Sequence, residues 1–201
     1  MNMSGVNFKD ANLAASIIDR AYLPNATFKG TNLNFASIEN SQLQGATFQG
    51  AKAPDVHFKN NNFTLAQFPQ VQMTDAHLEG NLWISANLEG VNLSSTPHAL
   101  SVVKDNYFTQ AQLRRANLEN TMIEGNSFLD ASLKHANLST SDTVPHSSTG
   151  YRDLIENDFS GADLRGTSFK HKQWRDNTFT GTDVLMNTDT TGVELLGGNT
   201  F

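Results

Sequence analysis

Read in groups of five, the stretch from Val6 to Gly50 is VNFKD ANLAA SIIDR AYLPN ATFKG TNLNF ASIEN SQLQG ATFQG, with a large apolar residue third in every group. The same frame continues to Leu138 through twenty-seven groups, and every central residue except His98 is apolar. An α-helix repeats its apolar face about every 3.6 residues and a β-strand every second residue, so a strict period of five fits neither. We predict a short strand and a corner in each group, with four groups closing one square coil.

The columns that such coils would stack recur every four groups. The fifth place of a group is often Gly, Asn or Asp, residues that tolerate the positive φ of a tight corner. Coils would lie about 4.8 Å apart, the usual spacing of paired strands, so like residues would stack on like. One predicted core column reads Phe8, Phe28, Phe48, Phe68, Leu88, Phe108 and Phe128.

Five groups, ANLAA, ANLEG, ANLEN, ANLST and ADLRG, match the pattern A-(N/D)-L-x-x outright. Over residues 6 to about 186 the chain therefore resembles the pentapeptide-repeat family. The resemblance implies an all-β fold, a right-handed four-sided parallel β-helix of about eight to nine coils. It implies little about function, because fold and function separate readily.

One frame shift and one irregular tail divide the single domain that we predict over residues 1–201. Regular coils are expected over 6–140, and the frame then resumes one residue out of phase at NDFSG. Residues 141–156 should replace one side of a coil and add a loop of about eleven residues. Coils resume over 157–186, and 187–201 should cap the last coil, since a solenoid end leaves backbone groups unpaired.

Individual core positions follow from the same frame. Trp83 is expected to fill the place of Phe63 in the coil before it, and of Trp174 in a later coil. His98 is either a tolerated core residue or part of a local irregularity in TPHALSVVKD, which we favour. A ladder of inner asparagines, with amides bonded from coil to coil, is predicted at Asn106, Asn126, Asn157 and Asn177.

Composition excludes several classes of protein. A net charge of −6 argues against a surface that grips nucleic-acid phosphates. The absence of cysteine excludes disulfides and thiolate metal sites. The N-terminal MNMSGVNFKD has no basic segment followed by an apolar run, and no apolar stretch is long enough to span a bilayer. We expect a protein of the bacterial cytoplasm, or one delivered into a host cell without a standard signal peptide.

No motif points to catalysis. A phosphate-binding glycine loop, a nucleophile elbow and a plausible carboxylate pair are all missing from the sequence. His57 and His77 share an outward place on consecutive coils, with Glu79 nearby, so a metal site was weighed against two stacked surface histidines. We expect the latter, and therefore neither a metal nor a cofactor.

An outward column of carboxylates suggests an alternative function. It comprises Asp19, Glu39, Glu79 and Glu119, and Lys59 interrupts it. The quinolone-resistance (Qnr-like) group of the family contains DNA mimics that bind DNA gyrase, so the resemblance implies gyrase binding as an alternative. Arg114, Arg115 and Lys134 make an adjacent face basic, which argues against it.

Outward apolar residues suggest a binding surface instead. In the five-residue frame Leu82, Val102 and Met122 align on three consecutive coils, with Leu65 and Ile84 beside them. An apolar patch of a few hundred Å² usually marks a contact. Either the insertion folds over the patch, through residues such as Tyr151, or a protein partner covers it.

Three hypotheses from different classes follow. The leading one is a non-catalytic protein-protein interaction scaffold or targeting module, such as the β-helix that precedes the catalytic domain in some bacterial effectors. Gyrase binding by DNA mimicry is the second, and an enzyme is the third and weakest. A homodimer, formed through the C-terminal cap or the apolar side, is a further expectation.

Overall fold

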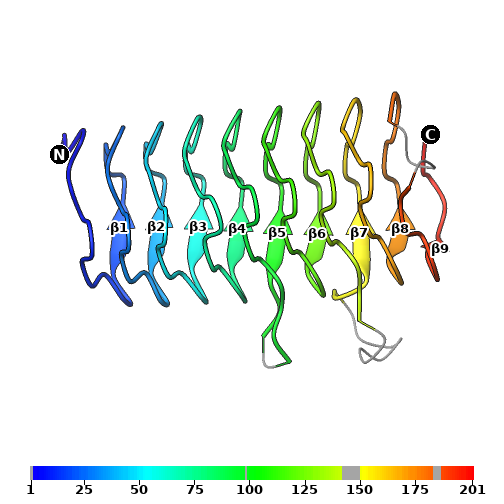
Figure 1. Ribbon diagram of the computed structural model, residues 1–201, viewed down its shortest axis with the longest axis horizontal. Coiled ribbons are helices and arrows are strands. Elements are labelled where there is room, and N and C mark those ends of the chain that lie inside the picture. Colours follow the sequence, from blue (N-terminus) through cyan, green and yellow to red (C-terminus); the bar gives the residue numbers. More distant parts are fainter. Residues whose placement is uncertain (1, 98, 142–149, 183–186) are drawn as a thin grey trace.

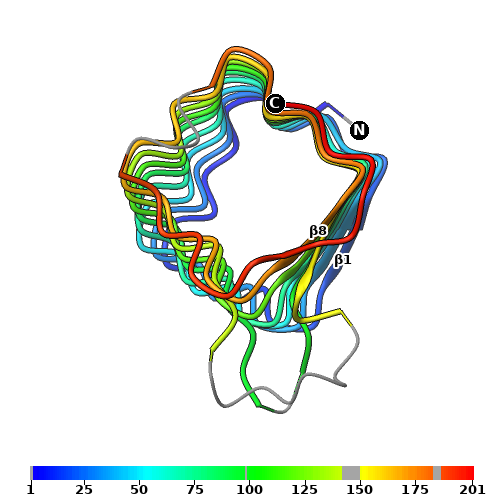
Figure 2. The ribbon, with the colours of Figure 1, turned by 90° about the vertical axis from the view of Figure 1, so that its right-hand side faces the viewer.

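The computed structural model describes residues 2–97, 99–141, 150–182 and 187–201, which wind into a prism of stacked coils. Figure 1 shows the coils side by side along the prism, and Figure 2 shows its four-sided outline from one end. Nine short strands pair in parallel, in chain order, into the sheet of one side. They are β1 (Ile17–Asp19), β2 (Ser37–Glu39), β3 (His57–Lys59), β4 (His77–Glu79), β5 (Val102–Lys104), β6 (Met122–Glu124), β7 (Asp153–Ile155), β8 (Gln173–Arg175) and β9 (Glu194–Leu195). The other sides are joined by isolated parallel bridges, and the described residues contain no helix.

The corners follow the predicted rule for the fifth place of each group. In the first corner the Ala11 N–H donates to the Phe8 carbonyl at 3.0 Å, and Asp10 between them has a φ of 57°. Even Phe35 and Leu65, which have large side chains, adopt φ values of 58° and 61° there. Positive φ at the third residue of a four-residue turn is typical of type II geometry. The repeat therefore imposes this conformation on residues that rarely adopt it alone.

The regular coils expected over 6–140 are interrupted once, within TPHALSVVKD, where we favoured a local irregularity. Ile38 pairs with Phe58, twenty residues ahead, whereas Leu78 pairs with Val103, twenty-five residues ahead. Five residues, 96–100, therefore leave the coil as a loop. His98, which we predicted as either a core residue or part of that irregularity, lies outside the described residues.

This loop divides the predicted phenylalanine column into two stacks. The first continues as leucine: Phe8, Phe28, Phe48, Phe68, Leu88, Leu113, Leu133 and Leu164. The second contains Phe63, Trp83, Phe108, Phe128, Phe159, Phe179 and Phe201. Trp83 stacks on Phe63 at 4.3 Å, as expected. Trp174 instead pairs with Leu154 in the sheet, so its predicted equivalence to Trp83 is wrong.

The second insertion has the length that the frame shift predicts. Ile123 pairs with Leu154, thirty-one residues ahead, which is eleven more than in a regular coil. β7 lies within the expected insertion, 141–156, and supplies the missing side of the coil. The described end of the insertion therefore contains an ordinary strand of the sheet.

The C-terminal residues extend the β-helix where we predicted a cap. Asp189 bridges to Ser168, β9 pairs with β8, and Phe201 stacks on Phe179 at 5.5 Å. Phe201 remains 65% exposed because nothing in the described chain lies beyond it in the stack. Residues 187–201 are thus a further coil with an open face.

Candidate interaction surface

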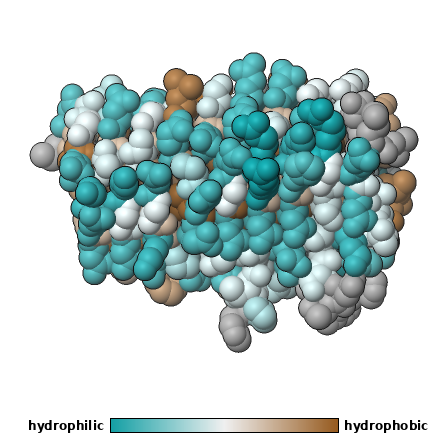
Figure 3. Space-filling view, in the orientation of Figure 1, coloured by the Kyte–Doolittle hydropathy of each residue, from teal (hydrophilic) through white to brown (hydrophobic). Residues whose placement is uncertain are grey.

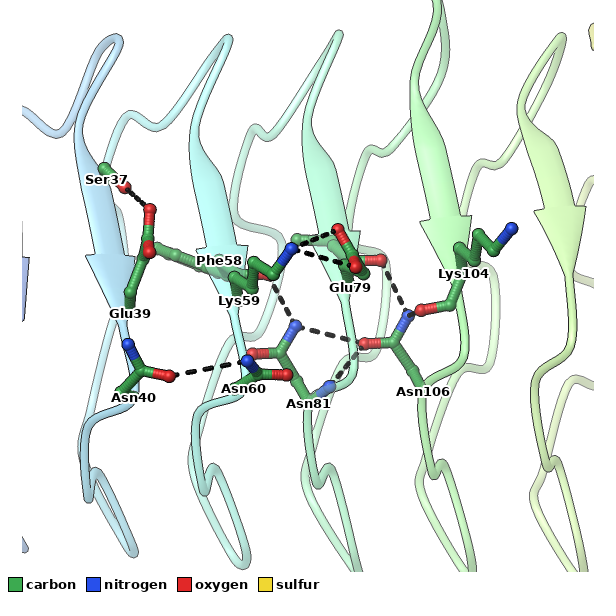
Figure 4. Close-up of polar contacts among 11 residues, drawn as sticks. Ser37, Glu39, Asn40, Phe58, Lys59, Asn60, Glu79, Asn81, Lys104 and Asn106 are labelled. Atoms are coloured by element: carbon green, nitrogen blue, oxygen red, sulfur yellow. Dashed lines mark hydrogen bonds and ion pairs between the residues drawn. The ribbon is translucent and has the colours of Figure 1, made fainter.

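The last residues of the sheet's strands form an outward column that alternates in charge from Glu39 to Glu124. Lys59 Nζ lies 3.0 Å from the Glu79 carboxylate, and Lys104 Nζ lies 2.8 Å from that of Glu124 (Figure 4 shows the first pair). The hydrogen bond with Glu124 raises the pKa of Lys104. In order, the column reads Asp19, Glu39, Lys59, Glu79, Lys104, Glu124, Ile155 and Arg175.

The predicted acidic column is therefore wrong beyond Glu79. Asp19, Glu39 and Glu79 do share the sheet, but Glu119 lies on another side of the coil, because the Ser95 N–H donates to its carbonyl. The residue that follows Glu79 is Lys104. A rod that alternates carboxylates with ammonium groups does not present the uniform charge of a DNA backbone.

The predicted apolar patch is likewise divided between two sides. Leu82 bridges to Tyr107, whereas Val102 pairs with His77 and Met122 in the sheet, so Leu82 and Val102 do not align. Leu65 and Ile84 stay on the side of Leu82, where Leu65 is 58% exposed. On the face that Figure 3 shows, hydrophobic groups are separated by hydrophilic ones. The structure therefore contains two smaller apolar areas.

Beside β5 a loop projects from one edge of the prism, and the described flanks of the second insertion leave the same edge beside β7 (Figures 1 and 2). We call this feature the paired-loop edge and define it by its described residues, 95–97, 99–101, 120–122, 139–141 and 150–152. It interrupts an otherwise regular prism. Loops held on a rigid scaffold carry binding residues more often than regular elements do.

Hydrogen bonds hold the first loop and tie it to the second. The Asp75 carboxylate accepts from the Thr96 N–H at 2.6 Å and from its hydroxyl at 2.8 Å. The Ser95 hydroxyl donates to the Asn120 carbonyl at 2.6 Å, and Asn120 Oδ1 accepts from the Ser141 N–H at 2.8 Å. Asn120 therefore connects the bases of both loops.

Apolar contact between the loops adds to these hydrogen bonds. A Cβ placed on Gly150 would lie 2.7 Å from Leu100 Cδ2 and 3.9 Å from Met122 Sδ. Gly150 also has a φ of 89°, which disfavours any side chain there. The flank of the insertion thus packs against Met122, which is half-buried, as is Tyr151.

Two buried cations lie behind the second loop, and our sequence reasoning missed both. Arg152 and Lys172 are 2% and 0% exposed, in an inner column that elsewhere holds small residues such as Ser101 and Thr121. Arg152 donates to Glu194 at 3.0 Å. A large charged residue at the first place of a group was the available signal, because that place otherwise holds small residues.

Lys172 joins the second loop to the coil. Its ammonium donates to the Tyr151 carbonyl at 2.8 Å and to the Thr121 carbonyl. Burial lowers the pKa of Lys172 to about 7. The negative charge of Asp153 acts to raise this pKa, and the positive charge of Arg152 acts to lower it further. The Lys172 side chain therefore links the end of the second insertion to the neighbouring coil by hydrogen bonds.

The histidine pair lies on the sheet as predicted. The rings of His57 and His77 stack with centroids 4.7 Å apart, and burial together with His57 lowers the pKa of His77. Within the described ranges, no three His, Asp, Glu or Cys residues come together as metal ligands. No helix in the described part of the chain could cross a membrane.

A family model matches the repeated part of the chain. A model of the family described as "Pentapeptide repeats (8 copies)" matches residues 7–45, 41–80 and 107–139, more than half of the chain. HetL, a pentapeptide-repeat protein involved in heterocyst differentiation regulation in the cyanobacterium Nostoc sp. strain PCC 7120, is 18% identical. The alignment covers 98% of this chain and 86% of HetL with a TM-score of 0.47.

A second structure is that of QnrB1, a plasmid-mediated fluoroquinolone resistance protein. One trypsin-treated variant of QnrB1 is 15% identical to this chain and has a TM-score of 0.51. The alignment covers 96% of this chain and 90% of QnrB1. No curated protein sequence matches significantly. From the family match and the coil geometry, we conclude that the chain belongs to the pentapeptide-repeat family.

Proposed function

We propose that the protein is a non-catalytic scaffold that binds a protein partner through the paired-loop edge. The observation that carries the proposal is the meeting of two insertions, from separate coils, at Leu100 and Gly150. Their bases are fixed by Asp75 and Asn120. Such preorganisation reduces the entropy lost on binding.

A scaffold role also agrees with the chemistry of the described residues. On the sheet Lys59 pairs with Glu79 and Lys104 with Glu124, and no described residue supplies a third metal ligand beside the stacked histidines. The coil core is filled with aromatic and aliphatic side chains, so it offers no site for a substrate. Rigid repeats that display loops are suited to binding.

Substitutions at the edge test the proposal. Leu100→Asp and Met122→Asp place a charge between the loops, and Leu65→Asp is the matched control on another side. We would cross-link each purified variant in a bacterial and in a eukaryotic lysate and identify partners by quantitative mass spectrometry. Loss of a wild-type partner in the two edge variants alone is expected.

The choice of lysate separates two locations of action. A partner from the bacterial lysate supports a cytoplasmic role, and one from the eukaryotic lysate supports delivery into a host as an effector. An identical partner set for all four proteins contradicts the proposal. So does loss of the partner only in Leu65→Asp, which would assign binding to the side of Leu82 and Ile84.

Self-association stays a separate prediction. The last coil exposes Leu195, Leu196 and Phe201 by 61%, 55% and 65%. Sedimentation velocity of the wild type and of Phe201→Asp tests whether two chains pair through residues 187–201. A dimer that Phe201→Asp dissociates is expected, and a wild-type monomer at all concentrations contradicts it.

A further inference from the structure

A row of turn residues, five of its eight members basic, runs along a different corner of the prism, one side before the paired-loop edge in each coil. The row follows the stack that begins at Phe8, and hydrogen bonds such as Arg115 N–H to the Lys134 carbonyl set its register. Its members are Lys9, Lys29, Gln49, Pro69, Glu89, Arg114, Lys134 and Arg165. The chain as a whole has a net charge of −6, so this segregation is a property of the fold.

The row contains a recess at its most basic part. The recess has a volume of about 290 Å³ and is lined by Glu89, Arg114, Arg115, Lys134 and His135. These residues come from three consecutive coils, which the repeat brings together. Turn backbone on a rigid coil holds them in place, since a neighbouring coil pairs on each side.

The cations of the recess are only partly neutralised. Glu89 lies 3.7 Å from Arg114 Nη2 and 3.5 Å from Arg115 Nη1, longer than the usual 2.7–2.9 Å of a strong charged hydrogen bond. Arg115 is 73% exposed, and among the described residues Lys134 makes no ion pair. Three cations and one carboxylate leave a local charge of about +2.

The next coil does not add to this charge. Arg165 donates through Nε and Nη2 to the Asp163 carboxylate at 2.8 and 2.7 Å, and this pairing lowers the pKa of Asp163. The pair is neutral as a whole. The excess charge is therefore confined to Arg114, Arg115 and Lys134.

We propose that this recess binds a phosphate monoester, with Arg115 and Lys134 as its main donors. A phosphate monoester carries about −1.5 to −2 charges at pH 7, which matches the local excess. Planar guanidinium groups bind phosphate through paired hydrogen bonds, and clusters of arginine are a known mode of phosphate recognition. The Glu89 carboxylate contacts the guanidinium groups of Arg114 and Arg115 and therefore competes with the phosphate for them.

Calorimetric titration with inorganic phosphate, at constant ionic strength, tests the site. Saturable binding is expected, weakened about three- to tenfold by Arg115→Gln and by Lys134→Gln. Glu89→Gln should strengthen it about threefold, because the competing carboxylate is removed. Lys29→Gln, in the same row but four coils from Arg114, is the control and should leave the affinity unchanged.

Peptide titrations separate the two sources of such a group. A phosphoserine peptide that binds more tightly than phosphate, while its unphosphorylated form does not bind, assigns the site to a phosphorylated protein. Binding of phosphate alone assigns it to a small phosphate ester. Absence of saturation by any probe overturns the proposal, as does an equal loss of affinity in Lys29→Gln and Arg115→Gln. Circular dichroism of each variant confirms that it folds.

Discussion

At the scale of one residue, Asn106 shows how the coils are tied together. Its Oδ1 accepts from the Asn81 N–H at 3.0 Å and from Asn81 Nδ2 at 3.1 Å (Figure 4). Its Nδ2 donates to the Leu78 carbonyl at 2.8 Å and to Asn126 Oδ1 at 3.1 Å. The ladder predicted at Asn106, Asn126, Asn157 and Asn177 is thus present. It extends further, to Asn61, Asn81 and Asn199.

Asn106→Ala should destabilise the protein by about 2–4 kcal/mol, since it leaves buried groups of both neighbouring coils without partners. The free energy of unfolding from urea denaturation measures the effect. Asn92→Ala is the matched control, because Asn92 belongs to an outward, partly exposed amide row. We expect a cost below about 1 kcal/mol there. Equal costs for the two variants would show that the inner ladder contributes no more than a surface one.

Lys172 gives the protein a pH dependence above neutrality. Its pKa is about 7 when folded and 10.5 when unfolded, so between these values the unfolded chain binds more protons. Stability therefore rises with pH across this window. The neutral amine still has two N–H groups for the carbonyls of Thr121 and Tyr151.

Lys172→Met should remove this part of the pH dependence. Between pH 7 and 9, the wild-type free energy of unfolding should rise by roughly 1 to 3 kcal/mol more than that of the variant. Urea denaturation at both pH values measures the difference. Lys29→Met, which removes a lysine of the basic row, should behave as the wild type. Parallel pH profiles for wild type and Lys172→Met would contradict the assigned pKa.

At the scale of an element, the two loops depend on Asn120, which has a φ of 59° and one side-chain acceptor in use. Asn120→Gly keeps the backbone conformation and removes that acceptor. Hydrogen exchange at the Ser141 amide should then accelerate about fivefold, equivalent to roughly 1 kcal/mol. Asn40→Gly is the control, since Asn40 has a φ of 52° but lies on the corner after β2. Unchanged exchange at Ser141 would mean that the loop is held elsewhere.

At the scale of the whole molecule, charge alternation bears on DNA mimicry. Lys59 and Lys104 separate the carboxylates of Glu39, Glu79 and Glu124 in the sheet. We therefore expect no inhibition of gyrase supercoiling at micromolar protein, with a QnrB1 sample as a reference for the assay. Inhibition that disappears in Glu79→Gln would restore the alternative and assign it to the sheet.

Much of the fold could be predicted because the five-residue periodicity restricts the path that the chain can take. A large apolar residue at every third place can be buried by successive groups only if the chain turns between them. The carboxylate and apolar columns were harder, because each depends on which coils are neighbours. Glu119, Val102 and Met122 were misplaced for this reason, whereas Asp19, Glu39 and Leu82, which precede the first loop, were not.

The sequence by itself determined the coil, its corners and the eleven-residue insertion. Eleven is not a multiple of five, so the apolar residues after the insertion fall out of phase, and this change of phase can be seen in the sequence. Only the tertiary structure decided the alignment of columns beyond Leu88. The first loop inserts five residues, which is one full period, so the apolar pattern continues in phase. The groups that follow the loop nevertheless lie on a side of the prism adjacent to the one that the frame predicts for them. The five-residue period predicts the place of each residue within its group. Which groups lie next to one another in adjacent coils is known only from the strand pairing.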